Sequence, residues 1–154
     1  MREKCPFPQA NNMDFMIHIF LNIGMDGITK FDVQKSSGLK DRQGSYYLDA
    51  LVYLGLVEKY KTKYYLTERG KEIKLSPLEQ MNAMFCEVIL ENKMLKYLYD
   101  KTKDMESSKE SKEFISVILA TTFELGNSTA NRRASTVSAW FNWINKVKGG
   151  VNSE

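Results

Sequence analysis

The feature that most constrains the fold of this chain is a change of sequence period after Gly55. Before that glycine, apolar residues recur at helical spacing, whereas residues 56–60 and 63–67 are two short runs rich in Val, Tyr and Thr. Such runs are typical of β-strands. The Lys61-Thr62 pair between them predicts a turn, although it lacks the favoured Asn-Gly sequence. We therefore expect a small antiparallel hairpin in an otherwise helical chain.

Three helices and one extended piece are predicted before this hairpin, each bounded by a capping residue or a glycine. In order they are a helix from Asn11 or Asn12 to about Asn22, an extended piece at 28–30, a helix over 31–37, and a helix over 42–54 with Asp41 as its N-cap. Helix, extended piece, helix, helix and hairpin is the order of a winged helix-turn-helix. A first domain of this kind is predicted over residues 1–75.

The second half predicts a further set of helices. Ser76-Pro77-Leu78-Glu79 has the pattern of a capping box with proline in the first turn. We expect one long helix over 77–103, an exposed loop over 101–112, a helix over 113–124 and, after a turn at 125–127, a last helix from a Ser128 cap to about Val147. The predicted fold class is therefore mainly α, with tandem helix-turn-helix units. The first unit is the winged helix, the second covers 76–148, and a flexible tail follows over 149–154.

The positive charge of the chain is concentrated in one block. Of 154 residues, 22 are Lys or Arg and 19 are Asp or Glu, but residues 30–75 alone hold ten basic and six acidic side chains. This excess falls on the predicted winged helix-turn-helix, where a positive surface is typical of contact with DNA phosphates. The alternative is a solvated, lysine-rich surface without a partner.

The first candidate contact is the start of the third predicted helix, which in a winged helix-turn-helix enters the major groove. Long donors such as Arg and Gln can read guanine and adenine edges, and hydroxyl groups reach phosphates or bases. The candidate residues are Lys40, Arg42, Gln43, Ser45 and Tyr46. The alternative for Arg42 is a solvated surface charge. Tyr47 aligns with the apolar positions of the helix, so we expect it in the core.

The second candidate contact is the hairpin. Lysines at alternate positions on a tight turn form a local positive tip, for which phosphate contact is the expected use. The candidates are Lys61, Lys63 and Tyr64, with Lys59 beside them. The alternative is that the lysines only protect an exposed edge strand from pairing with other chains.

The third candidate contact is the start of the last helix, because a helix N-terminus favours phosphate. The candidates are Thr129, Asn131, Arg132, Arg133 and Thr136. The alternative is that the two arginines form salt bridges, for example with Glu124.

No catalytic, metal or cofactor site is predicted. The sequence has none of the common phosphate-binding, hydrolase or zinc-protease motifs, and its two cysteines, Cys5 and Cys86, lie far apart. The N-terminal residues lack the apolar stretch of a secretory signal, and the longest apolar run, 15–21, is too short to span a bilayer. We expect a soluble, cytoplasmic protein without a membrane segment.

Three segments carry a family resemblance: RQGSYYLDALVYLGLV at 42–57, NRRASTVSAWFNWI at 131–144, and FPQA at 7–10. In this order they resemble winged-helix modules that accompany type II restriction endonucleases and related mobile-defence proteins of bacteria and archaea. The resemblance implies two DNA-binding halves that act as a target-recognition unit. Such modules stand beside a nuclease domain, for which this chain has no room. A stand-alone recognition subunit, a regulator and a part of a longer nuclease remain as alternatives.

We therefore expect a double-stranded DNA-binding protein that is not an enzyme. It would serve as a target-recognition module or as a transcription regulator in a restriction or mobile-element system, with a second copy or a nuclease subunit as partner. The alternative is a protein–protein interaction or dimerisation module without DNA contact. Trp140 and Trp143 would then lie in the interface, since a dense aromatic stripe is more often core or interface than a stacking platform.

Overall fold

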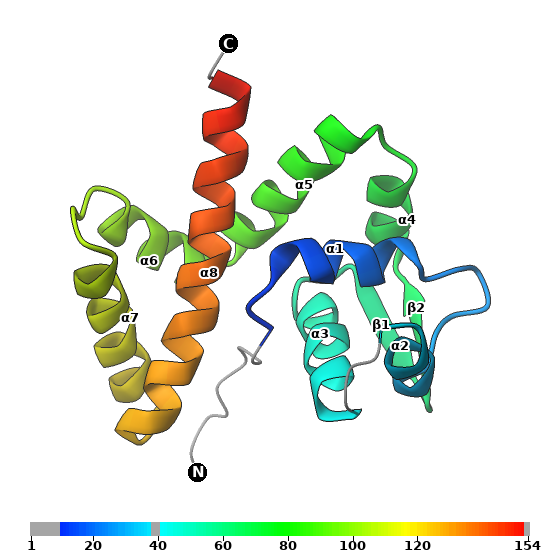
Figure 1. The fold of residues 1–154 in the computed structure, drawn as a ribbon, viewed down its shortest axis with the longest axis horizontal. Coiled ribbons are helices and arrows are strands. Elements are labelled where there is room, and N and C mark those ends of the chain that lie inside the picture. The colour runs from blue at the N-terminus through cyan, green and yellow to red at the C-terminus, as the bar shows by residue number, and fades with distance from the viewer. Residues whose placement is uncertain (1–9, 38–40, 153–154) are drawn as a thin grey trace.

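The computed structural model describes residues 10–37 and 41–152, with the backbone alone for residues 36, 37, 41, 42 and 150–152. Within these ranges the fold is mainly helical, with one two-stranded antiparallel sheet (Figure 1). The elements in chain order are α1 (Met13–Leu21), α2 (Lys30–Ser37), α3 (Asp41–Tyr53), β1 (Val57–Tyr60), β2 (Lys63–Leu66), α4 (Glu68–Lys74), α5 (Leu78–Glu91), α6 (Lys93–Thr102), α7 (Ser108–Phe123) and α8 (Asn127–Asn152). The prediction of a mainly α chain with one small hairpin is confirmed.

The first half of the fold is built around α3, which packs against α1, α2 and β1. Asn12 caps α1 as predicted, since its side chain accepts a hydrogen bond from the backbone of Phe15. The extended piece predicted over 28–30 is confirmed only at Ile28, since Lys30 already begins α2. Ile28 forms a bridge with Tyr64 in which the two residues exchange backbone hydrogen bonds of 2.9 and 2.8 Å. Ile28 therefore continues the sheet beside β2.

The hairpin has the predicted position. Its strands pair from Val57 opposite Leu66 to Tyr60 opposite Lys63. Lys61 makes the turn with a left-handed backbone at φ 58°. Such a conformation is uncommon for a residue with a side chain, and it closes the two strands tightly.

A close backbone approach joins the hairpin to α4. Thr67 caps α4 by accepting a hydrogen bond from the backbone of Gly70. A Cβ atom at Gly70 would lie 2.2 Å from the carbonyl oxygen of Leu56, closer than two atoms can pack. Only glycine fits this position without a shift of the backbone, so Gly70 sets how closely α4 follows the sheet.

The single helix predicted over 77–103 is wrong, because the chain breaks at Asn92 into α5 and α6. Asn92 has an extended backbone at ψ 124°, and its side-chain oxygen accepts from the backbone of Leu95 to cap α6. Its side-chain nitrogen donates to the hydroxyl of Tyr53 at the end of α3. Asparagine is a strong N-cap, and the partner on α3 holds it in this role.

The capping box predicted at Ser76 is also wrong. The Ser76 hydroxyl donates to the carbonyl oxygen of Glu72, and Pro77, the N-cap of α5, makes no side-chain capping bond. Ser76 therefore completes the end of α4 instead of starting α5.

The loop predicted over 101–112 is shorter in the structure, since α6 continues to Thr102 and Ser107 caps α7. The last helix begins at Asn127, one residue before the predicted Ser128 cap, and continues to Asn152. Its predicted end near Val147 is wrong, and the tail predicted from residue 149 is helical to 152. Residues 153 and 154 lie outside the described part of the chain.

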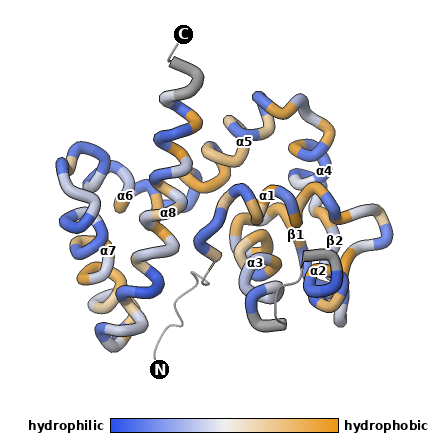
Figure 2. The backbone as a smooth tube through the Cα atoms, viewed as in Figure 1, coloured by the Kyte–Doolittle hydropathy of each residue, from blue (hydrophilic) through white to orange (hydrophobic). Residues whose placement is uncertain are grey.

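α7 and α8 run antiparallel along one another and make the largest contact between any two elements described (Figure 1). The predicted buried stripe of α8 is confirmed: Ala130, Ala134, Val137, Phe141 and Ile144 are all buried. Figure 2 shows the alternation of apolar and hydrophilic residues along the helices that such one-sided burial requires. The buried side chains of both halves form one continuous cluster.

Candidate nucleic-acid interface

The first turn of α3 and the turn of the hairpin lie along the same lower edge of the molecule in Figure 1, on the right-hand half. α2 lies in front of the hairpin in this view and packs against α3. The packing of α2 on α3 brings the backbones close at Gly44, where a Cβ atom would lie 3.5 Å from the carbonyl oxygen of Lys30. This edge therefore combines residues from α2, α3 and the hairpin.

The predicted contact residues of α3 differ in exposure. Gln43 is exposed, and Ser45 and Tyr46 are half-buried. Lys40 lies outside the described residues, as does the side chain of Arg42. Gln43 and Tyr46 are one turn apart, so they can face the same partner.

Tyr47 belongs to the core, as predicted. Its exposed fraction is 9%, and its hydroxyl accepts a hydrogen bond of 3.1 Å from the backbone of Asn12. Its ring also packs against Phe15. Tyr47 therefore positions α1 against α3 and is not available to a ligand.

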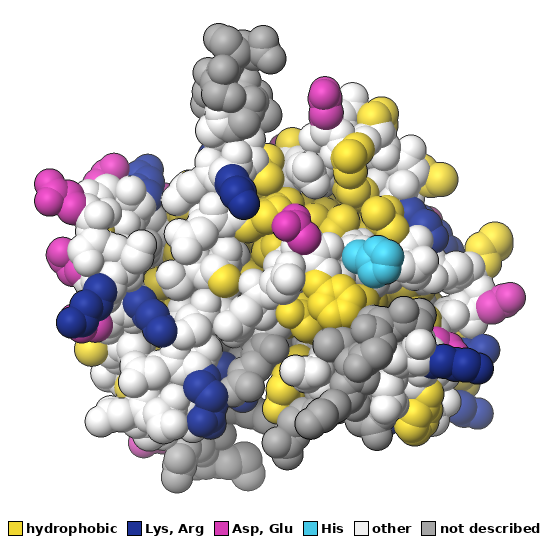
Figure 3. Space-filling view, in the orientation of Figure 1, with side chains coloured by type: hydrophobic (Ala, Val, Ile, Leu, Met, Phe, Trp, Pro, Cys, Tyr) yellow, Lys and Arg dark blue, Asp and Glu magenta, His cyan; other side chains and the backbone are white. Residues whose placement is uncertain are grey.

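The hairpin presents lysines to solvent. Lys59, Lys61 and Lys63 are all exposed, and Figure 3 shows dark blue side chains gathered at the lower right, over α2 and the hairpin. The ammonium of Lys61 lies 5.6 Å from the ring centre of Tyr60, and that of Lys63 donates to the carbonyl oxygen of Asp26 at 3.3 Å. The lysine tip predicted from the sequence is thus present on the surface.

Tyr64 was predicted at this surface and is not there. Its exposed fraction is 3%, and the ammonium of Lys59 lies 5.5 Å from its ring centre. Burial raises the pKa of the Tyr64 hydroxyl, and the charge of Asp49 raises that pKa further. Side chains alternate across a strand, so the residue after the exposed Lys63 points to the core.

The structure adds residues that the sequence analysis did not select. Phe31 at the start of α2 and Tyr60 beside the hairpin turn are 61% and 65% exposed, and each carries a lysine ammonium over its ring. Both rings lie beside the lysines of this edge. The sequence analysis named neither residue as a contact.

A reciprocal cap starts α2 at the same edge. The backbone of Thr29 donates to the carboxylate of Asp32 at 2.9 Å, and the backbone of Asp32 donates to the Thr29 hydroxyl at 3.1 Å. Hydrogen bonds to the Asp32 carboxyl from the backbone and the side chain of Thr29 hold its pKa below its ordinary value, helped by the charges of Lys63 and Lys35. Asp32 is therefore an anion among the lysines of this edge and lowers its positive potential locally.

The predicted contact residues on α8 also differ in exposure and in their hydrogen bonds. Thr136 is fully buried, and its hydroxyl donates to the side-chain oxygen of Asn11, so its prediction as a contact residue is wrong. Asn131 is exposed, but its side-chain oxygen accepts a hydrogen bond of 2.7 Å from Ser116 on α7. Both residues hold elements of the fold together.

The remaining candidates of α8 are Thr129, Arg132 and Arg133. The exposed guanidinium of Arg132 donates to the hydroxyls of Ser128 and Thr129 on its own helix. Nε and Nη1 of Arg133 are buried without a hydrogen-bond partner among the described residues. Arg133 therefore differs from Arg132, whose guanidinium is exposed to solvent. Burial of a cation without a partner is costly. The first turn of α8 lies at the lower left of Figure 1, away from the hairpin.

The aromatic stripe of α8 is mainly core. Trp140 is fully buried and Phe141 is 5% exposed, so Trp140 cannot lie in a subunit interface as the alternative prediction required. Trp143 is half-buried and its ring packs on Phe85 in an edge-to-face geometry.

The described residues provide neither a metal-binding cluster nor a membrane-spanning helix. No three or more His, Cys, Asp or Glu side chains there are grouped closely enough to bind a metal ion. No helix in the part of the chain that the structure describes has the length and apolar character to cross a membrane.

Comparison with known sequences identifies a family that this chain matches. The sequence profile of a domain of unknown function (DUF7226) matches residues 16–149, which span both halves of the fold. No curated protein and no solved structure matches the chain. Because the match extends over most of its length, the chain belongs to the DUF7226 family.

Proposed function

We propose that this chain binds double-stranded DNA through a winged helix-turn-helix formed by its first half. The observation that carries the proposal is the common edge of the first turn of α3 and the lysine-bearing hairpin turn (Figure 1). The bridge between Ile28 and Tyr64 supports it, because it adds a third extended piece beside the hairpin. Helix, bridge, helix, helix and hairpin follow in the order that this motif requires.

In this proposal α3 enters the major groove with its first turns. Arg42 and Gln43 read base edges, and Ser45 and Tyr46 contact a phosphate or a base. The exposure of Gln43 and the partial exposure of Tyr46 support these roles. Replacing Arg42 and Gln43 by alanine should remove about 1–3 kcal/mol of sequence discrimination per good base contact.

The hairpin supplies phosphate contacts. Lys61 and Lys63, with Lys40 before α3, neutralise phosphates on either side of the groove, which strengthens binding to every sequence alike. Tyr64 has no part in this contact because it is buried. Tyr60 and Phe31 extend the same surface as exposed rings.

A second set of contacts comes from the start of α8. Arg132 is exposed in the first turns of a long helix, where the helix dipole also favours a phosphate. Thr129 lies beside it. Thr136 is not part of this set because it is buried.

The biological setting of the proposal rests on the resemblance of residues 42–57 and 131–144 to winged-helix modules of restriction systems. We infer that the chain acts in the cytoplasm as a target-recognition module or a transcription regulator in a restriction or mobile-element system. It would work without a catalytic step of its own.

The test is fluorescence anisotropy with a labelled duplex of random sequence, titrated from about 50 to about 200 mM salt. The proposal expects micromolar binding that falls steeply with salt, because each neutralised phosphate contributes about −0.9 to the slope of log K against log salt. Lys61→Ala/Lys63→Ala should weaken binding and reduce the size of that slope by about 2.

The matched control is Lys109→Ala/Lys112→Ala, which removes the same charge from exposed positions on α7. It should leave the slope almost unchanged. Equal losses in both double variants would mean that net charge alone drives binding. No binding at the lowest salt would overturn the DNA proposal and favour a protein partner.

A further inference from the structure

We propose that two copies of this chain associate through the groove between α5, α6 and the last turns of α8. The groove has a volume of about 610 Å³. Ala83, Leu90 and Val147 form its apolar lining, and Glu87 from α5 and Lys148 from α8 also line it. This surface is separate from the α3 and hairpin edge, so the inference does not depend on DNA binding.

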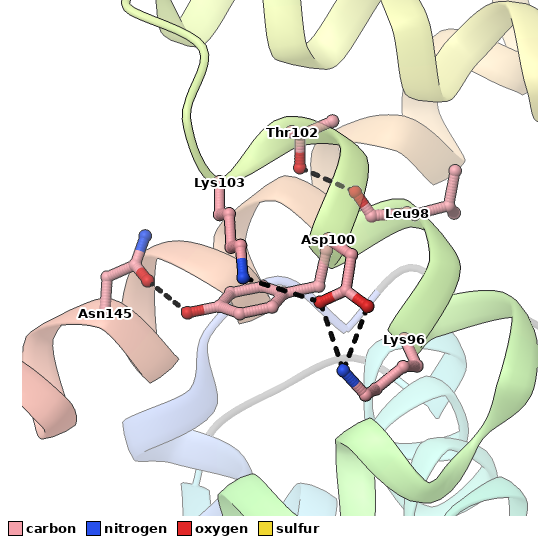
Figure 4. Close-up of polar contacts among 7 residues, drawn as sticks. Lys96, Leu98, Asp100, Thr102, Lys103 and Asn145 are labelled. Atoms are coloured by element: carbon pink, nitrogen blue, oxygen red, sulfur yellow. Dashed lines mark hydrogen bonds and ion pairs between the residues drawn. The ribbon is translucent and has the colours of Figure 1, made fainter.

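The helices around the groove are tied to one another and to the rest of the fold. Tyr99 on α6 donates a hydrogen bond of 2.6 Å to the side-chain oxygen of Asn145 on α8, as Figure 4 shows. Arg69 on α4 binds Glu91 at the end of α5 through two parallel hydrogen bonds. Asn92, the next residue, is tied to Tyr53 of α3. The walls are therefore held in place before a partner arrives, which favours association.

The charges that line the groove fall into two classes. Lys96 binds the carboxylate of Asp100 at 2.9 Å (Figure 4), and Glu91 binds Arg69, so these charges are already paired. Glu87 and Lys148 have no ion pair with any residue that the structure describes. The ammonium of Lys148 lies 5.2 Å from the ring centre of Tyr99, and its charge helps to lower the pKa of the Asp100 carboxyl.

The last turns of α8 extend beyond the rest of the molecule (Figure 1). Val147 is half-buried, and a Cβ atom at Gly149 would meet no other atom within 4 Å. Glycine disfavours a helix that nothing packs against, so a covering surface would stabilise these turns. The exposed lysines at 146 and 148 give this helix end a positive charge.

These observations favour a second copy as the occupant. The groove presents Glu87 from α5 and Lys148 from α8, and neither has an ion pair among the described residues. A two-fold axis can bring α8 of each copy to α5 of the other, so that Lys148 of one copy faces Glu87 of its partner. The apolar lining around Leu90 and Val147 is then covered in both copies by one contact. A surface that carries both charges and is self-complementary in this way fits its own copy.

The test is sedimentation equilibrium of the full chain at about 10–100 µM in moderate salt. The proposal expects a dimer, twice the 17.8 kDa of the chain. Glu87→Lys and Lys148→Glu each place like charges across the contact, and each should weaken self-association at least tenfold. An equimolar mixture of these two variants restores opposite charges and should recover a heterodimer.

The matched control is Lys112→Glu, which makes the same charge reversal at an exposed position on α7 and should remain dimeric. Circular dichroism verifies that each variant is folded. A wild-type chain that stays monomeric at 100 µM overturns the proposal. It is also overturned if both charge variants remain dimeric, or if they are monomeric and their mixture does not associate. Binding of an apolar dye to a monomer would show instead that the groove is open to small ligands.

Discussion

The indole Nε1 of Trp140 donates a hydrogen bond of 2.8 Å to the carbonyl oxygen of Ala10, a residue 130 positions earlier in the chain. Both residues are fully buried. The next two residues extend this connection, because Asn11 accepts from Thr136 on α8 and Asn12 donates to Tyr47 on α3. A short segment before α1 thus joins α8 to α3 and holds the two halves of the fold together.

Trp140→Phe should destabilise the protein by about 2–4 kcal/mol. The change leaves the buried Ala10 carbonyl without its donor and removes volume from the core. Urea unfolding followed by circular dichroism measures the loss. Trp143→Phe is the matched control, because Trp143 is only half-buried, and its cost should stay below about 1.5 kcal/mol. Equal losses for the two variants would show that the bond to Ala10 contributes little.

Gly70→Ala should be among the most destabilising single methyl additions in the chain, at about 3 kcal/mol or more, because the new Cβ would meet the carbonyl oxygen of Leu56 at 2.2 Å. Thermal unfolding compares it with Gly24→Ala, where a Cβ atom meets nothing within 4 Å and the change should be close to neutral. A stable Gly70→Ala variant would mean that α4 can move away from the sheet without cost.

The Arg69–Glu91 pair predicts a pH dependence of stability. The Arg69 guanidinium holds the pKa of the Glu91 carboxyl below its ordinary value. A carboxyl with a lowered pKa in the folded state contributes stability above its unfolded pKa of about 4.3 and loses it as the pH falls through the folded pKa. Glu91→Gln should therefore cost stability at pH 7 and cost less at pH 3.

Denaturant unfolding at both pH values measures this difference. Because the pair is at the surface, the effect should be small and should shrink in high salt. Glu113→Gln, at an exposed position on α7, controls for the loss of one negative charge. A Glu91→Gln variant with the same deficit at pH 3 as at pH 7 would contradict the ionic origin of the contribution.

The variant Tyr64→Phe tests whether the Tyr64 hydroxyl contributes to the stability of the fold or to DNA contact. The buried Tyr64 hydroxyl lies where Lys59 and Asp49 interact with it, so its removal should cost about 0.5–1.5 kcal/mol of stability. DNA affinity measured by anisotropy on the folded variant should remain within about twofold of the wild type, whereas Lys61→Ala should weaken it. A large loss of affinity in Tyr64→Phe would place its hydroxyl at the DNA after all.

Local sequence signals predicted most elements of the first half. Asn12 caps α1, Gly55 ends α3 with a positive φ of 79°, and the hairpin turns at Lys61. These signals act over a few residues, because a cap, a turn or a strand run is decided by the conformational preference of neighbouring residues. The capping prediction failed at Ser76, because its hydroxyl donates to the carbonyl oxygen of Glu72 in the preceding turn.

The candidate site was predicted less completely. The lysines of the hairpin are exposed as expected, but Thr136 and Tyr64 are core residues. A threonine on a polar-looking helix face can be assigned to the core only if its partner is known, and for Thr136 that partner is Asn11. Tyr64 is buried beneath Ile28, which pairs with it from a distant part of the chain.

The sequence by itself determined the mainly helical class, the hairpin and the buried stripe of α8, because periodicity and capping are local properties of the chain. Tertiary structure decided where the long helix breaks at Asn92, which donates to Tyr53, and how the two halves are joined through Trp140 and Ala10. Those choices depend on hydrogen-bond partners 39 and 130 residues away. A polar group can be buried at little cost only when it has a hydrogen-bond partner. Only the folded chain brings these distant partners together.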